Sequence, residues 1–189
     1  MISKAKAWQI RYATSILRDG GIVAHATEAV WGLACDPTNS AAVERLLTLK
    51  RRPEEKGLIL VSGQKEHFAD LLSLLPGHLV DRFNQRQNQP TTWLVPDPTS
   101  LIPKWIKGRH VTVAVRLSQH PTISALSKSF GCPLVTTSAN PAGRVAARDL
   151  RKVNQYFGSE LDYLLSSSLG GFSKPSEIRD LVTGGIARA

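Results

Sequence analysis

Cysteine, aromatic residues and long apolar runs are all scarce in this chain of 189 residues. Its two cysteines, Cys35 and Cys132, lie far apart, which excludes a disulfide framework and a cysteine-rich zinc site. Residues 1–21 lack the apolar segment of a signal peptide, and no apolar run approaches the length of a membrane span. We therefore expect buried thiols, no membrane contact and a cytoplasmic location.

Acidic residues are also few relative to basic ones. The chain has 24 Lys and Arg but only 15 Asp and Glu, so its net charge is +9. The basic residues gather in three clusters: residues 50–52; Lys104, Lys107 and Arg109; and Arg144, Arg148, Arg151 and Lys152. This clustering favours an anionic partner such as a nucleotide or RNA, although charge that serves only solubility is the alternative.

The glycine motifs of the common nucleotide-binding folds are missing. The chain contains neither Gly-x-x-x-x-Gly-Lys-Ser/Thr nor Gly-x-Gly-x-x-Gly, which argues against a P-loop and a Rossmann fold. Its five histidines do not have the spacing of metal ligands, and no triad around a nucleophile is evident. We expect the chemistry of this protein to depend on binding and charge.

Apolar periodicity switches repeatedly between the helical and the strand pattern along the chain. Helices are expected at residues 5–16, 39–50, 68–75, 79–86, 121–130 and 153–157. Strands are expected at residues 22–24, 58–61, 92–95, 110–116 and 163–165, with another beginning at residue 133; residues 97–108 predict a loop. With 42% hydrophobic residues and no linker or repeat, the sequence predicts one α/β domain over residues 1–189.

Residues 110–116 alternate between apolar and polar positions. Val111, Val113 and Val115 are expected in the core. Thr112 and Arg116 share the opposite face, which could form a cavity wall. An arginine at a strand end is often a salt-bridge partner at the rim, and this alternative stays open for Arg116.

The stretch from residue 49 to residue 61 is the most informative part of the sequence. It places four cations within residues 50–56, directly before the apolar run 58–61. That run predicts a buried strand, so the cations are expected at a fixed position beside the core. Fixed cations suit a polyanion such as a nucleotide triphosphate. The alternatives are a solvated basic loop, or cations that answer the dipole of the preceding helix.

A second segment, residues 133–143, begins as an apolar strand and continues into small hydroxyl and amide residues followed by Pro and Gly. This composition predicts a tight loop with exposed backbone N–H groups, which can approach a phosphate or a ribose closely. Serine, threonine and asparagine are also ordinary turn residues, so the segment alone indicates only a turn.

Together the two segments resemble the Lys-x-Arg and Ser-x-Asn signatures of the YrdC-like family, the threonylcarbamoyl-AMP synthases. In this chain the signatures are residues 50–52 and 138–140. Residues 25–33, 111–116 and 175–180 resemble further motifs of the family, in the same order. The chain is identified as a member of the short bacterial single-domain form. The resemblance implies a twisted open mixed β-sheet flanked by helices.

The resemblance also implies an activity. Members of the family join L-threonine, bicarbonate and ATP into threonylcarbamoyl-adenylate and release pyrophosphate. The product serves tRNA threonylcarbamoyl-transferase proteins, which modify adenosine 37 of tRNA. ATP is a substrate, and Mg²⁺ is expected to accompany its phosphates. Such a reaction needs positioning and charge rather than a covalent nucleophile.

Each candidate site residue has a task implied by the resemblance. The ATP phosphates are held by Lys50, Arg52 and Lys56, and the rest of the nucleotide by Ser138, Asn140, Thr112 and Arg188. L-threonine is bound by Arg116, whose guanidinium fits a carboxylate as a fork, and by Thr27, Thr136 and Ser176. No protein side chain is expected to bind the metal.

Other residues of these motifs receive weaker predictions. His25 and Ala26 stand where the family has Tyr-Pro, and residues 87–90 replace a Trp-Pro-Gly-Pro segment. Glu28 is expected either to orient neighbouring groups or a metal-bound water, or to be an ordinary surface residue. The histidines other than His25 are expected at the surface or rim. Trp31, beside Thr27, is expected to form part of a pocket wall.

Two competing functions remain open. One is a non-catalytic RNA-binding or ribosome-maturation factor that contacts tRNA or double-stranded RNA through the basic surface, and its binding would weaken steeply with salt. The other is a carbamoyl-transfer or hydrolytic relative that has lost adenylate synthesis. A protein that binds only the phosphate backbone of RNA would not need Ser138, Asn140 and Arg116. These residues therefore distinguish the synthase from an RNA-binding factor.

Overall fold

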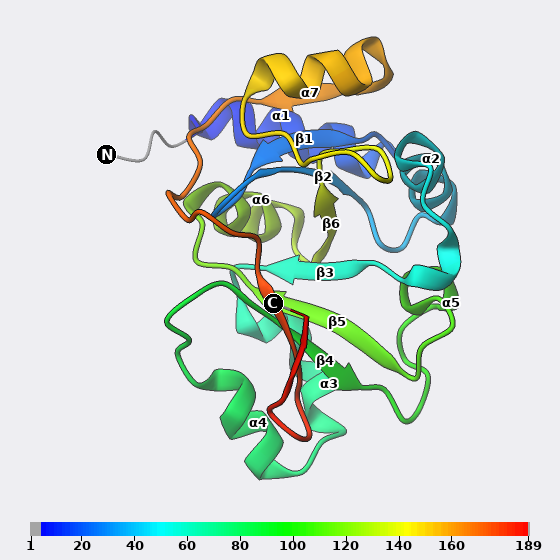
Figure 1. Cartoon of the computed structure of the whole chain (residues 1–189), viewed down its shortest axis with the longest axis vertical. Coiled ribbons are helices and arrows are strands. Elements are labelled where there is room, and N and C mark those ends of the chain that lie inside the picture. The colour runs from blue at the N-terminus through cyan, green and yellow to red at the C-terminus, as the bar shows by residue number, and fades with distance from the viewer. Residues whose placement is uncertain (1–4, 189) are drawn as a thin grey trace.

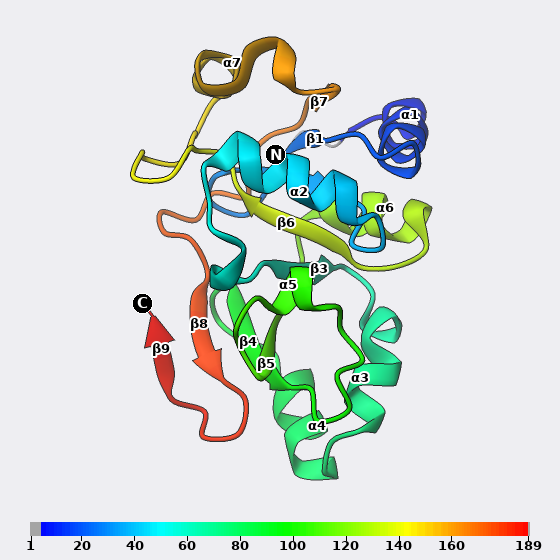
Figure 2. The same ribbon diagram turned by 90° about the vertical axis from the view of Figure 1, so that its right-hand side faces the viewer.

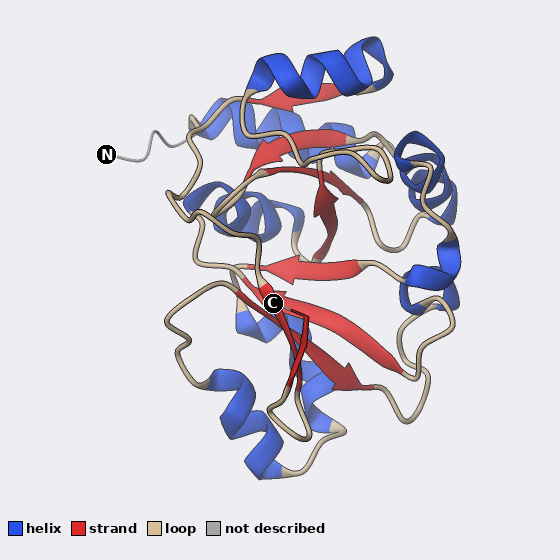
Figure 3. Ribbon diagram, viewed as in Figure 1, coloured by secondary structure: helices blue, strands red, loops and turns tan. Residues whose placement is uncertain are grey.

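A computed structural model describes residues 5–188, without the side chain of Arg188. The chain folds around one open sheet of nine strands (Figures 1 and 3). The strands are β1 (Val23–Ala26), β2 (Trp31–Cys35), β3 (Ile59–Ser62), β4 (Thr91–Pro96), β5 (Thr112–Leu117), β6 (Leu134–Ser138), β7 (Tyr163–Leu165), β8 (Glu177–Asp180) and β9 (Ile186–Arg188). Their order in the sheet is β7-β1-β2-β6-β3-β5-β4-β8-β9.

The sheet is mixed in direction. β1 and β7, β3 and β5, and β4 and β8 pair in parallel, whereas the other neighbours pair antiparallel. This arrangement confirms the predicted twisted open mixed sheet. Figure 2 shows β8 and β9 at the free edge beside β4, far from β7 and α7 (Leu150–Phe157).

Helices connect most of the strands. They are α1 (Ala7–Arg18), α2 (Ser40–Lys50), α3 (Ala69–Ser73), α4 (Gly77–Asn84), α5 (Lys104–Lys107), α6 (Pro121–Phe130) and α7, with 3-10 turns at Glu54–Lys56, Lys65–Phe68 and Gly158–Glu160. In the described part of the chain, no helix has the length and apolar character needed to cross a bilayer.

Helix α2 has well-defined ends, which fix where the following cations lie. Asn39 caps its N-terminus by accepting a hydrogen bond from the Ala42 amide at 3.1 Å. Arg51 ends the helix in the left-handed conformation, with φ of 50°. The chain therefore turns sharply after Lys50 and carries Arg52 toward β3.

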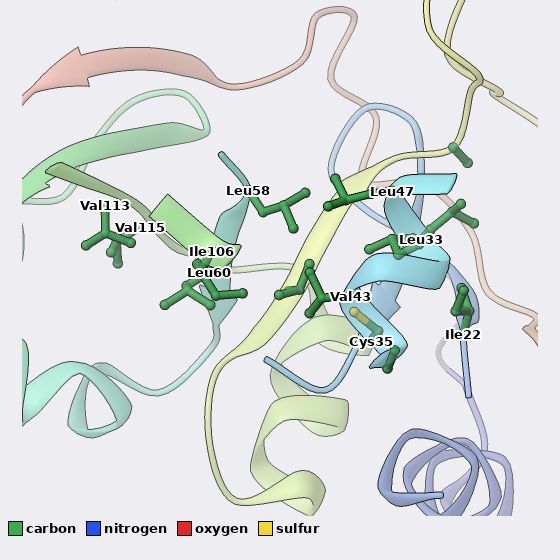
Figure 4. Packing of buried hydrophobic residues seen from close by; sticks show 14 of the residues in the cluster. Ile22, Leu33, Cys35, Val43, Leu47, Leu58, Leu60, Ile106, Val113 and Val115 are labelled. Atoms are coloured by element: carbon green, nitrogen blue, oxygen red, sulfur yellow. The ribbon is translucent and has the colours of Figure 1, made fainter. Parts of the chain in front are cut away.

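The large core lies between the sheet and α2, α5 and the segments after β3 (Figure 4). Leu33, Leu60 and Val115 project into it from β2, β3 and β5, and Val43 and Leu47 meet them from α2. Because side chains alternate along a strand, β5 and β6 present other residues to the opposite face of the sheet.

The smaller hydrophobic cluster joins α1 and α6 to the sheet. It contains Ile10 and Leu17 of α1, Leu126 of α6, and Val23 and Leu134 of β1 and β6. Trp8 and Tyr12 of the same helix are 56% and 50% exposed, so they lie outside this cluster.

Other local expectations were wrong in instructive ways. Val111 was expected in the core, but it precedes β5 and is 83% exposed. The apolar and polar alternation in the sequence therefore begins before the strand does. The expected loop 97–108 contains the one-turn helix α5. Strands β2, β8 and β9 were not predicted, because their sequences are short or lie within segments whose residue types also suit a loop.

A long segment, residues 166–176, which we call the strap, connects β7 to β8. Since these strands lie toward opposite edges of the sheet, the strap must cross it, and Figure 1 traces it in orange. Two backbone hydrogen bonds of 3.0 Å hold it, from Gly170 to the carbonyl of Thr27 and from Phe172 to the carbonyl of Glu28. The strap therefore rests on the turn between β1 and β2.

A buried ion pair fixes the segment between β4 and α5, and its loss should destabilise the protein. The Asp97 carboxylate accepts a hydrogen bond from Lys107 Nζ at 2.6 Å and from the amides of Leu101 and Ile102. Asp97→Ala leaves a buried ammonium and two amides unpaired, so we expect the free energy of unfolding to fall by about 3–5 kcal/mol. Urea denaturation measures this change.

The matched control is Arg45→Ala, because Arg45 pairs with Asp162 in a far more exposed position. Exposed pairs contribute little, and this variant should cost at most about 1 kcal/mol. Equal losses for the two variants would show that the buried pair does not have the stabilising role assigned to it.

Candidate functional site

A cavity of about 560 Å³ lies against the face of the sheet that the large core leaves free. Strands β2, β5 and β6 supply its floor, and the loop after α2 supplies cations to its wall. Pro175 and Ser176 of the strap and Ile178 of β8 line it from the C-terminal part of the chain. Segments far apart in the sequence thus meet at one site.

Arg52 and Lys56 bring positive charge to this cavity. Arg52 Nη2 donates to the carbonyl of Gly57 at 2.9 Å and to that of Lys56 at 3.4 Å, so the arginine also shapes its own loop. Gly57 has φ of 62°, and a Cβ there would lie 2.8 Å from the carbonyl oxygen of Lys107. Glycine is required at this position on both counts.

Lys50 has a different environment from Arg52 and Lys56, the other two cations predicted to bind the ATP phosphates. It is buried and is not among the residues that line the cavity. Its ammonium donates to the carbonyls of Ser138 and Asn140, the latter at 2.7 Å, and its own carbonyl accepts from the Ala142 amide. Burial, with a smaller contribution from the charge of Arg52, lowers the pKa of Lys50 to about 8. Lys50 thus connects α2 to the loop after β6.

That loop places Ser138 and Asn140 at the cavity. The Asn140 side-chain amide donates to the carbonyl of Arg144 at 2.8 Å and to that of Pro141 at 3.1 Å, which fixes the side chain. Its Oδ1 is buried and has no hydrogen-bond partner among the described residues. An oriented acceptor without a partner is suited to bind a ligand donor.

Arg116 projects from β5 into the cavity on the same face as Thr112. Its Nη2 lies 3.6 Å from Glu28 Oε2, and Glu28 Oε1 accepts a hydrogen bond from Ser118 at 2.5 Å. Glu28 is only 7% exposed, so the alternative of an ordinary surface residue is wrong. Burial alone would raise the pKa of Glu28, but Arg116 and Ser118 together bring it below its ordinary value. The pair is therefore charged.

The predicted threonine-binding hydroxyls also line the cavity. Thr27 donates to the carbonyl of Val30 at 2.7 Å, and Ser176 shares a 2.9 Å hydrogen bond with Thr92. Thr136 Oγ1 is buried without a partner in the described part of the chain. Its hydroxyl is free to bind a polar group of a ligand.

Two histidines lie deep in the structure beside this site. His25 is fully buried, and burial is the main reason that its pKa falls to about 4. His120 is 2% exposed and shares a 3.0 Å hydrogen bond between Nε2 and the carbonyl of Ser168 in the strap. The expectation that His120 lies at the surface or rim was therefore wrong, because it caps α6 beneath the strap.

The electrostatic character of the cavity is cationic. Arg52, Lys56 and Arg116 line it, whereas Lys107 forms an ion pair with Asp97. The cavity-lining carboxylate of Glu28 forms an ion pair with Arg116 and accepts a hydrogen bond from Ser118. No cluster of three or more metal-binding side chains occurs among the residues described. The lining is suited to anions and does not itself fit a metal ion.

The structure brings most of the predicted site residues together. All of them line the cavity except Lys50, which supports the loop, and Arg188, whose side chain lies outside the described residues. Trp31 lines the cavity as expected. Sequence reasoning missed Ser118, although it continues the alternation that places Arg116 and Thr112 on one face.

Comparison with known proteins places this geometry in a family. The family model Sua5_yciO_yrdC, described as "Telomere recombination", matches residues 15–189. A threonylcarbamoyl-AMP synthase of Hahella chejuensis is 51% identical over 96% of this chain and 98% of the relative. One of Pseudomonas aeruginosa is 50% identical over 100% of this chain and 99% of the relative.

A solved structure supports the same relationship. The crystal structure of P. abyssi Sua5 complexed with L-threonine superposes with a TM-score of 0.86 at 26% identity. The match covers 96% of this chain and 54% of the Sua5 chain, so the protein spans about half the length of that relative. On the strength of the family model and its close relatives, the chain belongs to the Sua5_yciO_yrdC family.

Proposed function

We propose that the protein synthesises L-threonylcarbamoyl-adenylate from L-threonine, bicarbonate and ATP. One observation carries this function: a single cavity unites Arg52 and Lys56, the Ser138–Asn140 loop, and Arg116. Two curated relatives that align over almost their full length, from Hahella chejuensis and Pseudomonas aeruginosa, are threonylcarbamoyl-AMP synthases. The L-threonine in the P. abyssi relative supports an amino-acid substrate.

The reaction requires two bonds to form in sequence. The threonine amine and bicarbonate first give a carbamate with loss of water. A carbamate oxygen then bonds to the α-phosphorus of ATP as the bond to pyrophosphate breaks, so the products are threonylcarbamoyl-adenylate and pyrophosphate. Negative charge gathers on the leaving phosphates, and fixed cations stabilise it most effectively.

The residues divide this work by position. Arg52 and Lys56 neutralise the phosphates, while Lys50 holds the loop whose Ser138 and Asn140 contact the nucleotide together with Thr112. Arg116 binds the threonine carboxylate, and Thr27, Thr136 and Ser176 orient the rest of the amino acid. Mg²⁺ is bound by the ATP phosphates, since the cavity lining is cationic. The assignment of Arg188 to the nucleotide stays a prediction.

We also propose the wider setting of this reaction. Residues 1–189 act as one unit in the cytoplasm, and the adenylate passes to transferase proteins that modify tRNA. The net charge of +9 supports contact with tRNA or double-stranded RNA.

The decisive experiment incubates purified protein with ATP, Mg²⁺ and bicarbonate, with and without L-threonine. Pyrophosphate release that depends on threonine, together with the adenylate in the product mixture, is the expected result. Serine at equal concentration is the matched control for the amino acid. Folded protein that releases no pyrophosphate would overturn the proposal, and salt-sensitive RNA binding by the same protein would favour the non-catalytic alternative.

A further inference from the structure

A buried polar network lies behind Arg116, and the reaction as described leaves it without a task. Its members are Glu28 from the turn between β1 and β2, and Ser118 and His120 from the segment between β5 and α6. All three side chains are buried. Buried polar groups are costly unless they are paired, so a network of this kind calls for an explanation.

Ser118 fixes the orientation of the Glu28 carboxylate. The Ser118 amide donates to the carbonyl of Ser62 at 2.8 Å, and its hydroxyl accepts a hydrogen bond from the His120 amide at 3.2 Å. The same hydroxyl donates its hydrogen to Glu28 Oε1 at 2.5 Å. Because the Ser118 hydroxyl both accepts and donates a hydrogen bond, its orientation is fixed, and it fixes the orientation of the carboxylate in turn.

The backbone of Glu28 is held equally firmly. Its carbonyl accepts a hydrogen bond from the Phe172 amide of the strap at 3.0 Å. Gly170 packs so closely that a Cβ there would lie 2.8 Å from the Cα of Glu28. The carboxylate is therefore a fixed negative charge with little freedom to follow Arg116, and the guanidinium must adapt to it.

Arg116 is held by this charge without being saturated. The 3.6 Å separation between Nη2 and Glu28 Oε2 is an ion pair that is too long for a hydrogen bond. Its Nε is buried and lacks a hydrogen-bond partner within the described residues. The guanidinium is thus oriented while keeping donors available, which a ligand carboxylate can accept.

We propose that Glu28, oriented by Ser118, is a positioning residue that directs the Arg116 guanidinium toward the carboxylate of the amino-acid substrate. This inference rests on the proposed function, because it assigns Arg116 to that carboxylate. Glu28 itself does not touch the reacting atoms in this scheme. Its low pKa also makes it a weak base, which argues against a role in deprotonating the threonine amine.

The test is Glu28→Gln, which keeps the size of the side chain and removes its charge. We expect the KM for L-threonine to rise about tenfold, while kcat and the KM for ATP stay within about twofold. Ser118→Ala should raise the KM for L-threonine about threefold. Glu177→Gln is the matched control, because Glu177 pairs with Arg179 at 2.9 Å outside the cavity lining, and it should leave all three parameters unchanged.

A double-mutant cycle separates positioning from a general structural role. In an Arg116→Ala background, Glu28→Gln should cause no further loss of threonine binding, because its effect passes through the arginine. L-threoninol, which lacks the carboxylate, should bind equally to the wild type and to Glu28→Gln. Additive effects in the cycle, or equal rises in the KM values for threonine and ATP, would overturn the proposal.

Calorimetry and adenylate formation by the wild-type protein distinguish failure of the proposed function from failure of the inference about Glu28. If the wild-type protein binds L-threonine in calorimetry but forms no adenylate, the function is wrong, and Glu28 is judged by the same variants in the binding experiment. If the wild-type protein neither binds L-threonine nor forms adenylate, both proposals are wrong.

Discussion

Arg116→Ala is expected to raise the KM for L-threonine at least about thirtyfold, with less than about a threefold change in the KM for ATP. The side chain is buried and cavity-lining, and its loss removes the partner of the threonine carboxylate. Truncating one member of a desolvated charge pair costs about 2–5 kcal/mol, and each 1.4 kcal/mol is a factor of ten. Initial rates of pyrophosphate release over a range of threonine concentrations measure the effect.

Arg116→Lys should recover only part of this loss, because an ammonium cannot present the planar fork of a guanidinium. Arg45→Ala, at an exposed ion pair, serves as the control for removing an arginine and should behave as the wild type. Equal rises in the KM values for threonine and ATP would show that Arg116 maintains the shape of the cavity rather than binding the amino acid.

Lys50→Met is expected to reduce kcat/KM for ATP at least about a hundredfold while leaving the fold intact. Methionine keeps the length of the side chain but releases the carbonyls of Ser138 and Asn140. A shift of about 1 Å in positioning residues can cost about a hundredfold in rate. The released carbonyls lose their donor, which costs about 1–3 kcal/mol, so the Tm should fall by several degrees while the protein stays folded at the assay temperature.

Lys128→Met, on the exposed part of α6, is the matched control and should change neither quantity. Kinetics and thermal unfolding on the same preparations are needed, because loss of activity in proportion to unfolding would contradict a role at the site. Near-normal turnover of a folded Lys50→Met protein would show that the loop holds its shape without the ammonium.

Periodicity predicted the fold well where one face of an element is apolar. Helix α2 was expected within residues 39–50, and its apolar residues Val43, Leu46 and Leu47 are all buried. Strand β5 was expected with Val113 and Val115 in the core. In such segments the local pattern and the tertiary packing agree, so a single sequence suffices.

Periodicity failed where packing alone decides the structure. In β2, consecutive residues from Trp31 to Cys35 are all buried, so no alternation marks them as a strand. Strand β8 is half-buried throughout and is stabilised by parallel pairing with the distant β4. Such pairings depend on segments far away in the chain, and an analysis of neighbouring residues in the sequence cannot detect them.

The candidate site was predicted mainly through motifs. The buried network of Glu28, Ser118 and His120 could not be predicted from the sequence. The motifs located Arg52, Ser138 and Arg116, but they gave no indication that Glu28 is buried. Its burial depends on the strap, which reaches it from residues 170 and 172. A glutamate between threonine and alanine gives no local sign of the charge that it meets in the folded protein.

The position of β6 has a consequence for how the protein is made. It lies between β2 and β3 in the sheet, although both strands precede it in the chain by many residues. During synthesis, residues 31–35 and 59–62 emerge long before residues 134–138 can join them. Each of the two early strands then carries an open edge, which is a template for aggregation. Insertion of β6 unites the two halves of the sheet, and pairing between segments so distant in the chain slows folding because the loop-closure entropy must be lost first.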